Sequence, residues 1–217
     1  MHRKDILKIT KELIELQSRY AFEARKIITL ERLENFQKLF PTKLEELDYE
    51  EKMLREPLVE HVGDLPIIAT FLHQFIEHKE VVNLGRSLIM LSIHDIGETV
   101  LGDVFTFDKT KIQETDEYDA ALKLLPDYLQ KYYEEYEKRE SSDAKYAKAV
   151  DSISPLLHEM VLPELTYLRF EKFDFNTQKI FDKKINDFEW DNVLLEIFKL
   201  LIEEYKKIEI GEKTIFV

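Results

Sequence analysis

The sequence predicts an all-α fold that forms one domain over residues 1–217. Apolar residues recur at spacings of three and four along most of the chain, which is the period of helices that bury one face. Only 5 glycines and 6 prolines supply turn signals, too few for a sandwich or barrel of many short strands. The chain has 217 residues, is 44% hydrophobic and 12% aromatic, and can therefore bury one sizeable core.

The N-terminal region predicts helix over residues 5–40. Its apolar side chains keep helical spacing, which fits two successive helices or one long helix with a single buried face. Pro41 and Thr42 mark a break in that pattern. Thr42 followed by Glu45 fits a capping box, so a further helix is expected to begin there.

Two apolar segments form the middle of the chain. Residues 66–77 predict a helix with a mostly apolar face. Residues 84–94 are almost continuously apolar and predict a buried helix. A polar loop is expected around 102–116.

The C-terminal half predicts amphipathic helices over 117–139, 143–162 and 186–207. Within the first of these, the tyrosine-rich stretch 128–140 is expected to form the edge of the core beside a solvated face. Segment 169–185 mixes charged and aromatic residues and has no clear period. The last helix either packs on the core or forms the seam of a homodimer, and the sequence leaves both open.

Charge and composition limit the classes of partner. The formal net charge is −13, so the surface lacks the basic field of a protein that binds nucleic acid as a polymer. The chain has no cysteine, and therefore neither disulfides nor a thiolate site. The N-terminus lacks the apolar core of a signal peptide, and no run approaches the length of a membrane span. We expect a cytoplasmic protein with no membrane association.

The stretch HDIGETVLGD at 94–103 carries the strongest chemical signal. His94 and Asp95 end an apolar helix, a position where polar groups are costly unless something pairs with them. A divalent metal would do so, and imidazole with carboxylate suits Mn, Fe, Co, Ni or Zn. His61 and Asp151 are candidates for further ligands. The alternative is a core histidine bonded to Asp95 or to a backbone carbonyl, and local pattern alone favours neither.

The order of these motifs resembles that of the HD-domain phosphohydrolases, and more closely their 5′-deoxynucleotidase branch. The match spans about 55–155, with 1–54 and 160–217 as flanking helices. It consists of REPLVEH at 55–61, HDIGETVLGD at 94–103, a helix with Lys111, Glu117 and Ala121 that reaches LLP at 124–126, and AKYAKAVD at 144–151.

The resemblance implies an HD-domain helical bundle and a set of site residues. It assigns His61, His94, Asp95 and Asp151 as ligands of one divalent transition metal. Two further acidic residues complete the implied site. They are Glu98, which would act at the water or the leaving group, and Asp103, which would help to place the substrate.

The cations expected near the pocket are few. Arg55 is the nearest replacement for an arginine that this branch usually has upstream of the first histidine, where the present stretch, 43–51, is acidic. Lys109 and Lys111 are the other expected substrate-binding residues, with Lys148 on the helix of Asp151 as a further cation.

Two more features bear on the site. Pro66 follows His61 where the family continues a helix, so the helix is expected to kink or to begin near Asp64. No histidine lies between residues 95 and 151. Two-metal HD proteins resemble one another in carrying additional histidines in that interval. One metal is therefore expected. His73, His78 and His158 are interpreted as ordinary surface or partly buried residues.

The function expected from this resemblance is a metal-dependent phosphohydrolase. It would release phosphate from small phosphomonoesters, with nucleoside 5′-monophosphates first. The alternatives are a non-catalytic HD-type regulatory or binding module, and a two-metal HD phosphodiesterase or oxygenase. The presence of all four ligand types and of Glu98 argues against the first, and the missing histidines argue against the second.

Overall fold

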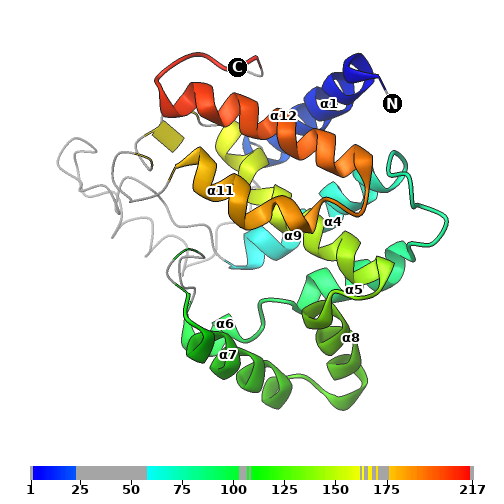
Figure 1. Cartoon of the computed structure of the whole chain (residues 1–217). Helices are drawn as coiled ribbons and strands as arrows, with labels where there is room; N and C mark the ends of the chain where they lie inside the picture. The colour runs from blue at the N-terminus through cyan, green and yellow to red at the C-terminus, as the bar shows by residue number, and fades with distance from the viewer. Residues whose placement is uncertain are drawn as a thin grey trace.

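The computed structural model describes residues 2–22, 58–102, 107, 109–161, 163, 166–167, 170 and 176–215, and the regular structure in this part of the chain is helical (Figure 1). The predicted all-α class is confirmed. The elements are α1 (Arg3–Phe22), α4 (Leu58–His73), α5 (Leu84–Ile93), α6 (Glu98–Leu101), α7 (Lys111–Leu124), α8 (Asp127–Lys138), α9 (Ser142–Val161), α11 (Thr177–Lys184), the 3₁₀ turn η2 (Ile185–Asp187) and α12 (Asn192–Glu209).

Helix α9 is the centre of the bundle. It contacts α4 and α5, α1 and α12, and also α8 and η2 (Figure 1). Small residues such as Ala144, Ala147 and Ala149 are fully buried along it, and they let the neighbouring helices approach closely. Ile153 and Leu157 continue the same buried surface. Residues on different faces of α9 can therefore meet side chains from several other helices.

Helix α5 is anchored to α8 and α9 by charged groups at its start. The side chain of Asn83 caps the helix by accepting the backbone N–H of Arg86 at 3.2 Å. The Arg86 guanidinium donates to Asp143 at 2.9 Å and also pairs with Glu135. The buried helix predicted over 84–94 is confirmed, with Met90 and Leu91 in the core. This anchoring fixes where the end of α5 lies.

Helix α4 runs through Pro66, so the expectation that the helix begins near Asp64 is wrong. It begins at Leu58 rather than near Asp64, and it ends at His73 rather than at residue 77. Proline removes one backbone hydrogen bond, yet Leu65 and Ile68 beside it are fully buried. Packing therefore keeps the helix continuous, and His61 lies on its N-terminal part.

The prediction of a single helix over residues 117–139 is wrong. The structure has α7 and then α8, separated at Leu125 and Pro126. Proline disfavours the helical conformation for the residue before it, so α7 ends there. The loop predicted over 102–116 is also shorter, because a capping box between Thr110 and Gln113 starts α7 at Lys111.

The C-terminal helices differ from the prediction mainly at their starts. The unassigned segment 169–185 contains α11, and the helix predicted from residue 186 begins at Asn192. Asp191 caps α12 by accepting the N–H groups of Val193 and Leu194, which sets that start. The helix predicted over 143–162 is confirmed as α9.

At the N-terminus the structure describes α1 within the predicted 5–40 region, and the remainder of that region lies outside the described residues. The Thr42–Glu45 capping box also lies outside them. Among the helices that the structure describes, none combines the length and the apolar character that a membrane span requires.

Candidate metal centre

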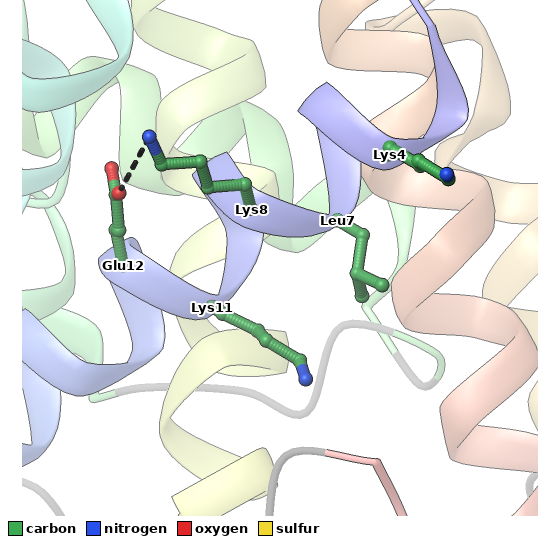
Figure 2. A pocket seen from close by; sticks show the side chains of 5 residues that line it. All are labelled: Lys4, Leu7, Lys8, Lys11 and Glu12. Atoms are coloured by element: carbon green, nitrogen blue, oxygen red, sulfur yellow. Dashed lines mark ion pairs between the residues drawn. The ribbon is translucent and has the colours of Figure 1, made fainter.

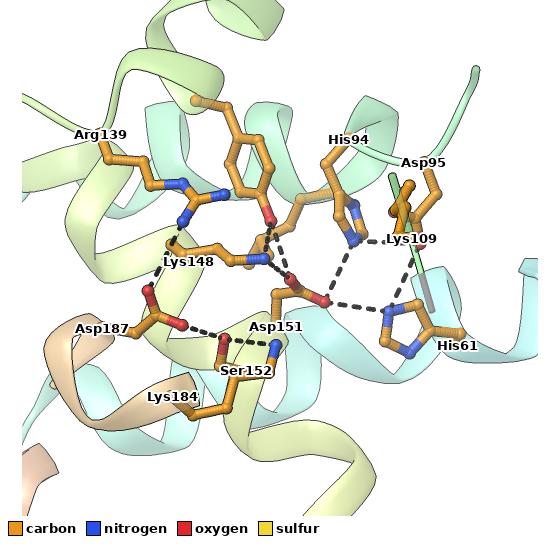
Figure 3. A network of polar contacts seen from close by, with 12 residues as sticks. His61, His94, Asp95, Lys109, Arg139, Lys148, Asp151, Ser152, Lys184 and Asp187 are labelled. Carbon is orange, nitrogen blue, oxygen red and sulfur yellow. Dashed lines mark hydrogen bonds and ion pairs between the residues drawn. The ribbon is translucent and has the colours of Figure 1, made fainter. Parts of the chain in front are cut away.

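Four side chains predicted as ligands converge from three helices (Figure 3). His61 comes from α4, His94 and Asp95 follow directly after α5, and Asp151 lies on α9. The Nε2 atoms of His61 and His94 are both 3.3 Å from Asp151 Oδ1. The same two nitrogens lie 3.6 Å and 3.1 Å from Asp95 Oδ2. The resemblance predicted this set, and the fold brings all four together.

The two carboxylate oxygens of Asp151 have different partners. Oδ1 faces both imidazoles, whereas Oδ2 accepts a hydrogen bond from Lys148 Nζ at 2.7 Å (Figure 3). The same oxygen accepts a second hydrogen bond from Tyr136 Oη at 2.9 Å. Lys148 lies one helical turn before Asp151 on α9, and Tyr136 projects from α8. These contacts hold the carboxylate in one orientation and leave Oδ1 directed at the two histidines.

His94 is held in a fixed orientation. Its Nδ1 lies 2.9 Å from the carbonyl oxygen of Leu91. A carbonyl can only accept, so Nδ1 is the donor and Nε2 is the nitrogen that faces the carboxylates. The side chain is only 2% exposed. A metal-ligating histidine is commonly oriented by such a bond from its second nitrogen.

The electrostatics of the cluster favour positive charge between its carboxylates. Burial opposes the charged form of His94, but Asp151 and Asp95 raise its pKa to about 10. The pKa of His61 is also raised, because the same carboxylates outweigh burial. Burial alone would raise the pKa of Asp151, yet Lys148 and His94 hold it well below its usual range. The centre therefore attracts a cation, either protons or a metal ion.

The donor set fits a divalent transition metal. Ligand atoms at about 2.0–2.2 Å from one tetrahedral ion are roughly 3.3–3.6 Å from one another. The spacings between the imidazole nitrogens and the carboxylate oxygens are 3.1–3.6 Å. Two nitrogens with carboxylate oxygens suit Mn, Fe, Co, Ni or Zn better than Ca or Mg. Distances and chemistry thus agree for His61, His94 and Asp151, whose ligand atoms all lie within 4.8 Å of one another. Asp95 contacts both imidazoles but is not part of that three-residue group.

Glu98 lies one turn beyond Asp95, and its backbone N–H donates to the Asp95 carbonyl at 3.0 Å. Its carboxylate is 3.4 Å from Lys109 Nζ, which also pairs with Glu117. The glycine before it, Gly97, permits a close approach, because a Cβ there would overlap the Glu117 carbonyl oxygen. The glycine in the motif thus lets α6 lie against α7.

The other predicted substrate-binding residues are not gathered into one place. Arg55 and Asp103 lie outside the described residues. Lys111 is exposed at the start of α7, whereas Lys148 is engaged with Asp151. Although burial disfavours its charge, contacts with Glu117 and Glu98 raise the pKa of Lys109, so it stays positive. The substrate roles of these residues stay predictions.

The remaining histidines of the middle and C-terminal regions have partners of their own. His73 Nε2 is 3.2 Å from the carbonyl oxygen of Val82, and His158 Nε2 is 3.0 Å from Asp64. His78 Nδ1 lies 3.1 Å from Asp191 Oδ2. His73 and His158 are partly buried and His78 is exposed, which is consistent with the interpretation of all three as surface or partly buried residues, although His78 also belongs to a group with Glu77 and Asp191 that could hold a metal.

None of the four predicted ligands lines either of two surface pockets, each of about 330 Å³. One lies over α1, where Lys8 and Glu12 pair across its edge (Figure 2). The other is bordered by Lys148, whose amine reaches Asp151 from it. Its lining residues are Arg139, Lys145, Lys148, Asn186, Asp187, Glu189 and Trp190.

Comparison with known proteins identifies the family. A model of the HD domain matches residues 48–192, which include all four predicted ligands. The 5′-deoxynucleotidase HDDC2 of Bos taurus is 25% identical over 162 residues, 70% of this chain and 74% of the bovine protein. The human 5′-deoxynucleotidase HDDC2 is 26% identical over 136 residues, 58% of this chain and 64% of the human one.

A solved structure shares the fold. The crystal structure of a predicted metal-dependent phosphohydrolase from Magnetospirillum magnetotacticum superposes with a TM-score of 0.62 at 29% identity. The similarity covers 77% of this chain and 85% of that one. Together with the match over residues 48–192, this confirms the resemblance inferred from the motifs: the chain belongs to the HD-domain family.

Proposed function

We propose that this HD-domain protein is a metal-dependent phosphohydrolase that releases phosphate from small phosphomonoesters, with nucleoside 5′-monophosphates as the first candidates. The observation that carries the proposal is the convergence of His61 and His94 on Asp151 Oδ1 at 3.3 Å, with Asp95 beside both imidazoles. The nucleotide preference is supported by the similarity to 5′-deoxynucleotidases.

In this proposal His61, His94, Asp95 and Asp151 hold one divalent transition metal. When bound, such an ion lowers the pKa of water and offsets the negative charge of a phosphate. Lys148 and Tyr136 keep the Asp151 carboxylate oriented, and the Leu91 carbonyl keeps the His94 ring oriented. These contacts hold the ligands in place before substrate arrives.

The proposed reaction forms a bond between a water oxygen and phosphorus and breaks the bond from phosphorus to the ester oxygen. One proton leaves the attacking water, and one is taken up by the departing alkoxide. Glu98 is the proposed group for this transfer, because a positioned carboxylate can take and return a proton. Lys109 holds the Glu98 carboxylate at 3.4 Å. Asp103, outside the described residues, is proposed to place the substrate.

A small substrate fits the charge of the chain better than a polymer does. The net charge of −13 gives no long-range attraction to nucleic acid, whereas a few local cations suffice for one phosphate. Arg55 is the proposed replacement for the upstream arginine of the family, although it lies outside the described residues. Because the stretch 43–51 is acidic, ribonucleotides and deoxyribonucleotides should both be tested.

A metal-by-substrate screen tests the proposal. Purified protein is stripped with a chelator, reloaded separately with Mn, Fe, Co, Ni or Zn, and assayed for phosphate release. The substrates are nucleoside 5′-monophosphates with ribose or deoxyribose, sugar phosphates and oligonucleotides. We expect release from monophosphates that depends on added metal. No release from any monophosphate with any metal would contradict the proposal and favour a binding module, and faster cleavage of oligonucleotides would point to a phosphodiesterase.

A further inference from the structure

Lys184, the last residue of α11, extends its side chain toward Ser152, the residue that follows Asp151 on α9 (Figure 3). Its ammonium nitrogen donates to Ser152 Oγ at 3.3 Å. Within the part of the chain that the structure describes, no carboxylate oxygen forms an ion pair with this nitrogen, which is unusual for a lysine beside a cluster of acids.

The other cations of this network are already paired. Lys148 Nζ lies 2.7 Å from Asp151, and an Arg139 nitrogen lies 3.7 Å from Asp187. Lys109 contacts both Glu98 and Glu117. Each of these positive charges is therefore offset by a direct contact with a carboxylate. Lys184 differs because its hydrogen-bond partner is neutral.

Ser152 cannot satisfy the Lys184 ammonium. The Ser152 hydroxyl donates its one proton to Asp187 Oδ2 at 2.7 Å, so it offers Lys184 only a lone pair. An ammonium group has three N–H donors, and this contact uses one. Because the Ser152 side chain is itself buried and fixed, it sets the position of the amine without neutralising it.

The surroundings of Lys184 disfavour its charge. Burial and the neighbouring cations Lys148 and Arg139 lower the pKa of Lys184 to about 8, although Asp151 and Asp187 act in the opposite direction. A charged group in such surroundings gains from an arriving anion, which supplies both the missing charge and the missing hydrogen-bond acceptors. At neutral pH most Lys184 side chains are still protonated and can therefore bind an anion.

We infer that Lys184 binds the phosphate group of the substrate, as an anion-binding residue on the Asp151 side of the proposed metal centre. The inference rests on the proposed function, which supplies a phosphate as the anion. An ammonium hydrogen-bonds well to phosphate oxygens because both partners are charged. Lys184 lies inside the region that matches the HD-domain model.

The test compares Lys184→Met with Lys199→Met. Lys199 is a lysine on α12 that pairs with Glu196 at 3.0 Å on the surface, which makes it a matched control. Binding of inorganic phosphate is measured by calorimetry on both the chelated and the metal-loaded protein, and kcat and KM are measured with one nucleoside 5′-monophosphate. Metal content and thermal stability are recorded for every variant.

Removing the Lys184 charge should raise the Kd for phosphate and the KM by about tenfold, since one charge-assisted hydrogen bond is lost. Metal content should stay at the wild-type level, and stability should be unchanged or higher, because the ammonium is poorly accommodated without an anion. Lys184→Arg should restore most of the phosphate affinity. A merely structural role predicts lower stability with an unchanged Kd for phosphate.

An unchanged Kd for phosphate and an unchanged KM in Lys184→Met would overturn the inference, as would a wild-type protein that binds no phosphate. If Lys184→Met does not fold, Lys184→Gln provides a second neutral variant with the same expected result. A wild type that binds phosphate through Lys184 but releases none from any ester would leave this inference standing and contradict the proposed function alone.

Discussion

Asp191 and Asp151 are two aspartates whose side chains have little access to solvent, and their carboxylates are satisfied in different ways. The side chain of Asp191 is inaccessible and accepts backbone N–H groups from Glu77 at 2.7 Å, from Val193 at 3.0 Å and from Leu194 at 3.2 Å. It caps α12 and ties that helix to the segment after α4. Histidine and glutamate lie beside it too, so residue types alone would mark it as another metal site.

The described partners of Asp151 are all side chains, namely two imidazoles, an amine and a phenol. Asp191 has the imidazole of His78 as a side-chain partner, and its other described donors are backbone N–H groups. Backbone N–H groups keep their protons, so Asp191 is fixed in a structural role. Imidazoles can lose their protons and bind a metal through the same nitrogens. The set of donors around a poorly accessible carboxylate, more than its burial, therefore separates a chemical site from a structural one: two imidazoles face one oxygen of Asp151, whereas backbone N–H groups dominate around Asp191.

The sharpest test of this difference is the same substitution at both positions. Asp151→Asn should lower metal affinity by at least about 100-fold and reduce phosphate release to the level of chelated protein, because a neutral amide replaces a charged ligand. Asp191→Asn should keep its metal and change the free energy of unfolding by about 1 kcal/mol or less, since asparagine also caps helices. Elemental analysis measures the metal content of each variant, and denaturant unfolding measures its free energy of unfolding. Metal loss in the Asp191 variant alone would reverse the comparison.

Glu98→Gln separates the proposed proton-transfer group from the ligands. We expect turnover to fall by about 10²–10⁴, with metal content unchanged, because glutamine cannot take a proton from water. Single-turnover rates and metal content are measured on the same sample. Loss of metal would assign Glu98 to the ligand set, and an unchanged rate would remove it from the proposed mechanism.

Gly97→Ala tests whether the backbone positions Glu98. The new Cβ would overlap the Glu117 carbonyl oxygen and lie 2.7 Å from its Cγ, so α6 and α7 must separate. We expect a loss of about 1–3 kcal/mol in stability, together with lower activity. Gly63→Ala is the matched control, because nothing lies within 4 Å of a Cβ there and alanine favours helix. Equal stability and activity in the two variants would contradict the role of Gly97 in positioning Glu98.

The protonation states of the centre predict opposite effects of pH on the chelated and the metal-loaded protein. The pKa of His94 is raised to about 10 in the folded, chelated protein, against 6.5 for the ordinary group. This stabilisation is complete below pH 6.5 and is lost progressively as pH rises toward 10. Lys184, with a pKa lowered to about 8, adds the opposite trend above pH 8, so the clean window is pH 6.5–8.

In that window His94 alone should cost the chelated protein up to about 1.4 kcal/mol of stability per pH unit, and the raised pKa of His61 acts in the same direction. Metal affinity should rise over the same window because the imidazoles must give up protons to bind metal. Thermal melts of chelated protein and metal titrations at pH 6.5 and 8 check both signs. Metal affinity that falls with rising pH would contradict the proposed ligands.

The smallest expected effect concerns a single hydroxyl. Tyr136→Phe removes one of two hydrogen bonds to Asp151 Oδ2 and should weaken metal binding by up to about tenfold. Tyr146→Phe is the matched control, because the Tyr146 hydroxyl donates to the backbone carbonyl of Ala69 instead. It should lower stability without changing metal affinity. Equal metal affinities for the two variants would show that Tyr136 does not orient Asp151.

Much of this architecture was predictable because it depends on local pattern. Helical spacing predicted α5 and α9 within a residue or two, and the motif order predicted that His61, His94 and Asp151 meet, with Asp95 beside both imidazoles. The single helix predicted over 117–139 was wrong because apolar spacing continues across Pro126, which ends α7. The start of α12 was misplaced because the cap depends on Asp191, whose surroundings come from a distant segment.

The supporting residues were harder to predict, since they depend on tertiary packing. Tyr136 lies in a tyrosine-rich helix in which spacing predicts burial but not which hydroxyl meets Asp151. Lys148 could be found from its position one turn before Asp151 on the same helix. Lys184 lies in a segment with no clear period, and only the folded chain brings it to Ser152.

Metal content tests the central claim most directly. Purified wild-type protein, stripped and then reloaded with each transition metal, is measured by elemental analysis beside Asp151→Asn and Asp191→Asn. The account predicts one metal per chain in the wild type and in the Asp191 variant, and almost none in the Asp151 variant. Two metals per chain, no metal under any loading condition, or equal metal in the two variants would contradict it.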